Sequence, residues 1–249
     1  MSATASAISE TNAPRPEFQT THWSVILAAR GTSPEAHTAL EKLCRTYWYP
    51  LYAFLRREGQ SPDDAQDLTQ SFFARLIERR DFDRAQREKG RLRSFLLVSL
   101  KNFLINEWHR AHAAKRGGHE RFIALDELAA EERYALEPAD ALSADKIYER
   151  RWALTLLDCV MTQLESECIA AGNAELFFAL KPALTGEELT RSQAELATRF
   201  DMTENALKQA LFRLRQRFRG LLRTEIANTV ATLDSVEDEL RFLISVLRQ

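Results

Sequence analysis

Cysteine, glycine and proline are scarce in this chain of 249 residues, which contains three, eight and seven of them. Three cysteines are an odd number, and they lack C-x-x-C spacing, so neither a disulfide framework nor a zinc site is indicated. A reducing cytoplasm is the simplest setting for them. Few glycines and prolines suit helices joined by short turns. Because strand-like alternation of useful length is also missing, the sequence predicts an all-α fold.

Long apolar runs and catalytic motifs are missing as well. The longest apolar stretches, such as Phe95–Val98, are far too short to span a bilayer. The N-terminal MSATASAISETNAPRP lacks the basic and apolar regions of a secretory signal. There is no G-x-S-x-G motif, glycine-rich phosphate loop or pair of catalytic carboxylates. His109 and His112 have helical spacing, but no cysteine or H-E-x-x-H glutamate accompanies them. We therefore expect no enzyme, metal, cofactor, small-molecule substrate or membrane partner.

The charge is segregated along the chain, although the formal net charge is only −2. Residues 84–116 contain nine Lys/Arg against two Glu, and residues 203–223 contain six against one. Between them, residues 120–149 contain nine acidic residues against three basic ones. Two basic segments around an acidic one are typical of a protein that binds nucleic acid at two places. The alternative is that these charged side chains only form the solvent-exposed faces of helices and bind no partner.

Start and stop signals divide the chain into helices and into larger units. Ser33-Pro34 and Ser61-Pro62 each predict a helix start, and a long helix is expected from about Ser94 to Ala114. The predicted units are a disordered N-terminus (1–20), a helical domain (21–119), an acidic linker (120–146), a second helical domain (147–230) and a helical tail (231–249).

The clearest local pattern lies in residues 192–223, which predict two helices separated by a short break. Ser192 and Glu195 have the form of a capping box, and Thr203 is suited to cap the second helix. Apolar residues recur along that helix at steps of four and three (Leu207, Leu211, Leu214, Phe218, Leu221). Its other faces are basic. A short helix, a tight turn and a basic second helix are the elements of a helix-turn-helix that reads DNA.

Three motifs resemble those of bacterial RNA polymerase sigma factors of the extracytoplasmic-function (ECF) subfamily. DAQDLTQSF (64–72) is similar to the segment that docks on the β′ subunit. GRLRSFL (90–96), with Lys101-Asn102 and His109-Arg110, is similar to the segment that binds the −10 promoter element. ELA (195–197) through Arg215 is similar to the unit that reads the −35 element. Phe95 stands where this family usually has tryptophan, and Asp201 replaces its turn glycine.

The resemblance implies a promoter-specificity subunit without catalytic activity. The polymerase-binding residues would be Asp64, Asp67 and Gln70. The −10 contacts would come from Arg91, Arg93, Lys101, Asn102, Asn106 and Arg110. The −35 contacts would come from Thr203, Asn205, Lys208, Gln209 and Arg213. The implied partners are core RNA polymerase, through its β′ and β subunits, and promoter DNA, with an anti-sigma factor as a further candidate.

Two other functions fit the same residues. A helix-turn-helix regulator that acts without polymerase would bind its operator tightly alone, and a helical adaptor would bind only protein. The acidic linker raises a separate hypothesis, that it either lies in the basic RNA path of the polymerase or covers the protein's own basic surfaces when the protein is free.

Overall fold

The computed structural model describes residues 34–78, 90–113, 127–135, 142–189, 191–230, 232 and 234–248. Every regular element in these residues is a helix, so the prediction of an all-α fold is confirmed. In chain order the helices are α2 (Pro34–Arg57), α3 (Pro62–Glu78), α4 (Leu92–Ala113), α5 (Glu127–Ala135), α6 (Ala144–Ala170), α7 (Ala174–Leu180), α8 (Pro182–Thr185), α9 (Gln193–Arg199), α10 (Glu204–Ala227) and α11 (Ser235–Leu247). The predicted disordered N-terminus and the predicted end of the long helix at Ala114 lie outside the described residues.

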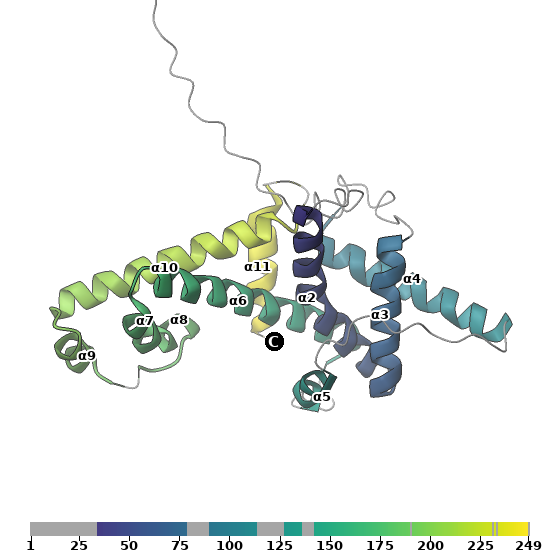
Figure 1. Cartoon of the computed structure of the whole chain (residues 1–249), viewed down its shortest axis with the longest axis horizontal. Coiled ribbons are helices and arrows are strands. Elements are labelled where there is room, and N and C mark those ends of the chain that lie inside the picture. Colours follow the sequence, from purple (N-terminus) through teal and green to yellow (C-terminus); the bar gives the residue numbers. More distant parts are fainter. Residues whose placement is uncertain are drawn as a thin grey trace, which may run out of the picture.

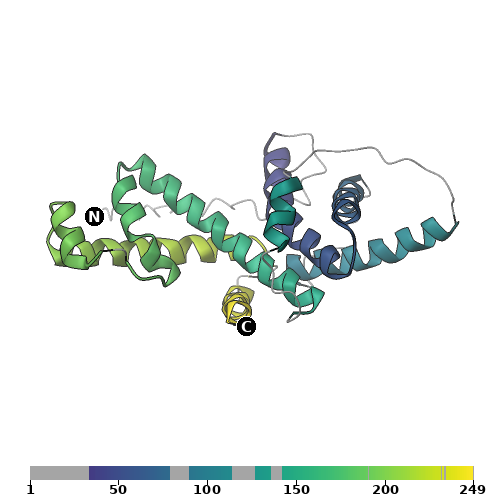
Figure 2. The ribbon, with the colours of Figure 1, turned by 90° about the horizontal axis from the view of Figure 1, so that it is seen from below.

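The described helices form an elongated molecule (Figures 1 and 2). Helices α2, α3 and α4 lie at one end and α7, α8 and α9 at the other. The long helices α6 and α10 run side by side and connect the two ends, and α11 lies near the middle, beside α6. Helices α6 and α11 therefore contact elements that come from both halves of the sequence.

One buried apolar cluster joins elements from both sides of the predicted linker. Its largest fully buried side chains include Tyr47 and Phe54 of α2 and Tyr148 and Trp152 of α6. The same cluster takes residues from α3, α4, α11 and the end of α10. Large aromatic side chains dominate the energetics of such cores. In this structure the two predicted helical domains are thus packed against each other, while their boundaries at 119 and 147 stay predictions.

A smaller apolar cluster holds the far end together and orients α9 and α10. Leu196 and Ala197 of α9 are buried with Leu207, Ala210 and Leu211 of α10. Burial of this one stripe of α10 leaves its opposite side exposed, as expected for an amphipathic helix.

Most predicted helix boundaries are confirmed. Helices α2 and α3 begin at Pro34 and Pro62, each preceded by a serine. After α2, Gly59 adopts a φ of 91°, a left-handed conformation that glycine takes without a steric cost.

The region predicted as a linker contains helical structure. Helix α5 lies inside it and packs on α2. Helix α6 begins at Ala144 rather than near Ile147, because the Ser143 hydroxyl accepts a hydrogen bond from the Lys146 amide (3.4 Å) and caps the helix there. The described parts of this segment are therefore packed against the rest of the protein.

Candidate nucleic-acid interface

The residues expected to contact the −35 element lie together on one side of α10, which we call the α10 surface. All five are exposed (Thr203, Asn205, Lys208, Gln209, Arg213). At 3.6 residues per turn the four that belong to α10 occupy one sector of the helix, opposite Leu207 and Leu211 in the core, and Thr203 is the N-cap that precedes the first turn. The helix thus presents amide and cationic side chains to solvent on a fixed backbone.

Local hydrogen bonds fix how α9 leads into α10. The Ser192 hydroxyl accepts from the Glu195 amide (3.3 Å), and the Glu195 carboxylate accepts from the Ser192 amide (2.8 Å), so the predicted capping box is confirmed. These bonds from Ser192 lower the pKa of Glu195. The Thr203 hydroxyl accepts from the Ala206 amide (3.1 Å) and caps α10 as predicted. Asp201, between the helices, has a φ of 50°, which aspartate accepts better than most residues.

Two arginines further along α10 are bound to neighbouring helices. Arg217 donates two hydrogen bonds to Glu167 of α6 (2.7 and 2.6 Å), which lowers the pKa of Glu167. Arg215 donates to the backbone carbonyl of Ala183 in α8 (3.1 Å). The basic charge of α10 is therefore divided between the exposed α10 surface and contacts that hold α6 and α8.

The residues expected at the −10 element belong to α4 and the residue before it, and we call this set the α4 surface (Arg91, Arg93, Lys101, Asn102, Asn106, Arg110). Arg93 differs from the rest, since its side chain is only 5% exposed. It lies in phase with Leu96 and Leu100, on the side of α4 that faces the core. In this structure Arg93 is therefore an interior residue, and its predicted phosphate contact stays a prediction.

Arg93 is held by a carboxylate from α11. Its guanidinium donates to both Glu239 oxygens (2.6 and 3.3 Å), and the Glu239 side chain is fully buried. The guanidinium also lies 3.7 Å from the Phe242 ring centroid and 5.2 Å from that of Trp152. A weaker contact runs to Glu149 of α6 (3.4 Å), whose pKa is raised by burial. Paired and stacked in this way, the buried charge is compensated on several sides.

Two further cations of the α4 surface are also ion-paired. Arg91 contacts the same Glu239 carboxylate (2.8 Å). Lys101 contacts Asp145 in the first turn of α6 (2.7 Å), and both of these side chains are about half exposed. Asn102 and Asn106 are exposed, and the Asn106 amide donates to the backbone of Asn102 (2.9 Å). The side chain of Arg110 lies outside the described residues.

The expected polymerase-binding residues follow one another along α3. The Ser61 hydroxyl donates to the Asp64 carboxylate (2.7 Å) and accepts from the Asp64 amide (3.1 Å), so Asp64 belongs to the cap of α3. Asp67 is exposed and Gln70 is half-buried. Phe72, on another side of the helix, is buried in the core. Asp64 and Asp67 are thus both exposed, and only Asp64 is used in the helix cap.

Sequence reasoning missed several exposed apolar side chains beside these residues. Val98, Ile105 and Trp108 are 56–58% exposed on α4, in phase with Lys101. Phe212 is 56% exposed in the middle of the α10 surface. Their spacing of three, four and seven from the polar candidates was the available signal. In contrast, Phe103 of the same helix is buried.

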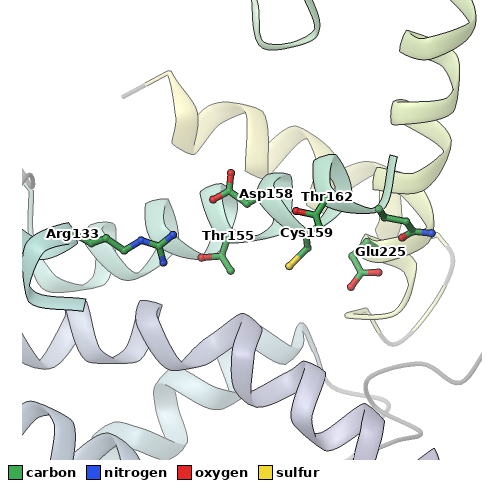
Figure 3. Close-up of a pocket in the computed structure, with 7 residues that line it drawn as sticks. Arg133, Thr155, Asp158, Cys159, Thr162 and Glu225 are labelled. Atoms are coloured by element: carbon green, nitrogen blue, oxygen red, sulfur yellow. The ribbon is translucent and has the colours of Figure 1, made fainter. Parts of the chain in front are cut away.

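A cavity of about 410 Å³ lies where α5, α6 and α10 meet (Figure 3). It is lined by residues of both charge signs (Arg133, Thr155, Asp158, Cys159, Thr162, Gln163, Glu225). Among the described residues, no group of three or more His, Cys, Asp or Glu side chains could hold a metal ion. None of the described helices is long and apolar enough to span a membrane. The clustered cations, amides and exposed aromatics of α4 and α10 are better suited to nucleic acid than this cavity is to a ligand.

Comparison with known proteins identifies the part of the chain that contains the α3 and α4 candidates. Residues 43–114, from α2 through α4, match the family described as Sigma-70 region 2. Regions of this kind generally bind core RNA polymerase and promoter DNA. The match supports a sigma-70 family factor with a role in promoter recognition for RNA polymerase. Sigma-70 region 2 is a transcription initiation factor domain and not an enzyme.

The match ends before α5, and no curated protein or solved structure matches the chain. The match therefore assigns no role to α5 to α11.

Proposed function

We propose that this protein is a sigma factor of the ECF subfamily, which directs core RNA polymerase to promoters by contacting the −10 and −35 elements. The observation that carries the proposal is the α10 surface. A capped helix with exposed Lys208, Gln209 and Arg213 on a buried stripe occurs in the same chain as a Sigma-70 region 2 match. In a major groove, lysine and arginine suit guanine, and glutamine suits adenine.

The α4 surface would contact the −10 element. Asn102 and Asn106 offer donors and acceptors to base edges, and Lys101 and Arg91 offer charge to phosphates. The exposed Ile105 and Trp108 lie one and two turns beyond Lys101 on the same side of α4, and an exposed aromatic face is suited to stack an unpaired base. These side chains give α4 the chemistry that a separated strand requires.

Asp67 and Gln70 on α3 would contact core polymerase, Asp67 by pairing with a cation and Gln70 by hydrogen bonds. In functional terms we assign polymerase and −10 binding to residues 21–119 and −35 binding to 147–230. Residues 120–146 connect these two parts, and residues 231–249 form a C-terminal addition.

Run-off transcription with purified core polymerase tests the proposal, on promoters selected from a random pool by the protein–core complex. We expect a transcript that depends on the protein, and co-purification of the protein with core. Asp67→Arg should reduce core binding, whereas Asp63→Arg, the same change at another exposed position of α3, serves as the matched control. Absence of both transcript and core binding would overturn the proposal.

Binding measurements with the same protein and DNA distinguish the two alternative functions. Tight binding to one DNA sequence without core would favour an independent helix-turn-helix regulator. A salt titration identifies a protein-binding adaptor, because several phosphate contacts make the logarithm of the affinity fall steeply with the logarithm of the salt concentration. An adaptor would show no such slope.

A further inference from the structure

Carboxylates from the C-terminal half of the chain hold cations of the α4 surface. Asp145 of α6 binds Lys101 at 2.7 Å, and Glu239 of α11 binds Arg91 at 2.8 Å. Both acids lie outside residues 43–114, the segment that matches Sigma-70 region 2. A region 2 without α6 and α11 would present these two cations to solvent.

The acids are held in place by the fold. The buried pair between Glu239 and Arg93 anchors α11 against the start of α4. The backbone amide of Leu92 donates to the Thr229 carbonyl (3.0 Å), and the Tyr148 hydroxyl donates to the Arg93 carbonyl (2.8 Å). Helices α6 and α11 are therefore fixed beside the N-terminal part of α4, and Figures 1 and 2 show α11 beside α6.

We propose that Asp145 and Glu239 are internal competitors of DNA, which occupy Lys101 and Arg91 in the free protein, keep these cations from the phosphates of non-promoter DNA, and are exchanged for phosphates only when promoter DNA binds. A carboxylate and a phosphate oxygen are alternative partners for the same cation. This inference rests on the proposed function, in which the α4 surface contacts DNA. It extends the masking hypothesis from the acidic linker to α11.

The two pairs differ in how easily they are exchanged. Lys101 and Asp145 are 43% and 52% exposed, so water already screens their attraction. Arg91 is 37% exposed, but its partner Glu239 is fully buried and also bound to Arg93. Arg91 can therefore swing out to DNA while Glu239 remains compensated by Arg93.

Fluorescence anisotropy with a labelled random-sequence single-stranded DNA tests the proposal on the full chain without core. Asp145→Asn should tighten binding about two- to fivefold at low salt, the range expected for one exposed ion pair. The diagnostic readout is the salt dependence. For single strands, each additional phosphate contact steepens the slope of log K against log salt by about 0.7. We expect that increase for Asp145→Asn, the same for Glu239→Gln, and about twice that for the double variant.

Further variants assign the effect to the named cations. Asp238→Asn removes a charge from the same helix and releases Arg241 rather than a residue of the α4 surface, so its slope should equal that of the wild type. Lys101→Gln should abolish the gain of Asp145→Asn, and Arg91→Gln should abolish that of Glu239→Gln.

The possible outcomes are distinct from those of the transcription test. A wild-type slope for Asp145→Asn, or an equal gain for Asp238→Asn, overturns the competition even if transcription with core succeeds. If circular dichroism shows that Glu239→Gln does not fold, the exposed Asp145–Lys101 pair decides alone. Steeper slopes without transcription would keep the competition and reject the sigma-factor proposal.

Discussion

The two surfaces proposed to bind DNA differ in what occupies them. On α10, Lys208 and Arg213 are exposed on a helix whose neighbours α8 and α9 bury only its opposite side. On α4, the cations at the start of the helix lie against α6 and α11, and both of those helices bring carboxylates. A local count of basic residues therefore predicts where charge is concentrated, but not whether it is available.

The sharpest test of this contrast is Arg93→Ala, which would leave Glu239 buried without its main partner. Breaking a buried pair from one side costs about 3–5 kcal/mol, so we expect a loss of that size in the free energy of unfolding by urea. The matched control is Arg45→Ala, because Arg45 pairs with Glu41 on the exposed side of α2 and such a pair contributes about 0.5 kcal/mol. A loss below about 1 kcal/mol for Arg93→Ala would show that the interior role assigned to Arg93 is wrong.

The open α10 surface should show the reverse behaviour, a large effect on DNA and a small one on folding. Arg213→Ala should weaken promoter binding of the core complex by about 1–3 kcal/mol, roughly 5- to 150-fold, if Arg213 reads a base. Its melting temperature should stay near that of the wild type because the side chain is exposed. Arg217→Ala is the control, since Arg217 is bound to Glu167; an equal loss of DNA binding there would remove the distinction between the two arginines.

Much of the fold follows from local signals in the sequence. Helices α2 and α3 begin at the prolines of the two Ser-Pro pairs. Ser61, the capping box of α9 and Thr203 act through hydrogen bonds between residues three positions apart. The apolar stripe of α10 likewise predicted which of its sides is buried. Such features are readable because cause and effect lie in the same turn.

The features that local patterns did not predict depend on contacts between residues that are far apart in the sequence. Arg93 and Glu239 are separated by 146 positions, so nothing near either residue indicates the pair. The phase of Arg93 with Leu96 and Leu100 could have shown that it faces inward, but not what it meets there. The packing of α5 could not be predicted for the same reason, because Glu131 holds this helix to Arg56, 75 positions away. Three motifs located the candidate surfaces, whereas tertiary packing decides which of their cations are accessible.

Phe212 offers a finer test of the α10 surface. Its exposed ring lies between the polar candidates, where an apolar group can contact the methyl group of thymine. Replacing thymine by uracil in a selected −35 site should weaken wild-type binding by about 0.8 kcal/mol, roughly fourfold, the contribution of one buried methyl-sized group. Phe212→Ala should bind both sites alike, and the measurement is competition between the two DNAs for the core complex. Retained discrimination by Phe212→Ala would assign the methyl contact to another residue.

The smallest expected effect is on the stability contributed by Glu131, an acid that holds two helices together and, among the described residues, does not contact the α4 surface. It distinguishes such acids from Asp145 and Glu239. Glu131 accepts hydrogen bonds from Arg56 (2.7 and 3.0 Å) and from the Tyr52 hydroxyl (2.6 Å), and those from Arg56 contribute most to lowering its pKa below 4.5. The unfolded chain therefore binds this proton more readily than the folded one. The stability that Glu131 contributes is fully present above pH 4.5 and is lost as the pH falls through its folded pKa.

Because Glu131 is 38% exposed, solvent screening limits this contribution to about 0.5 kcal/mol. Thermal melts of the wild type and Glu131→Gln should differ by that amount at pH 7 and converge in acid. Glu149→Gln should show the opposite trend, because burial raises the pKa of Glu149 and its charged form costs stability as the pH rises. Neither the affinity for single-stranded DNA nor its salt slope should change in Glu131→Gln, since Arg56 is not part of the α4 surface. A steeper slope there would extend the internal competition from α6 and α11 to α5.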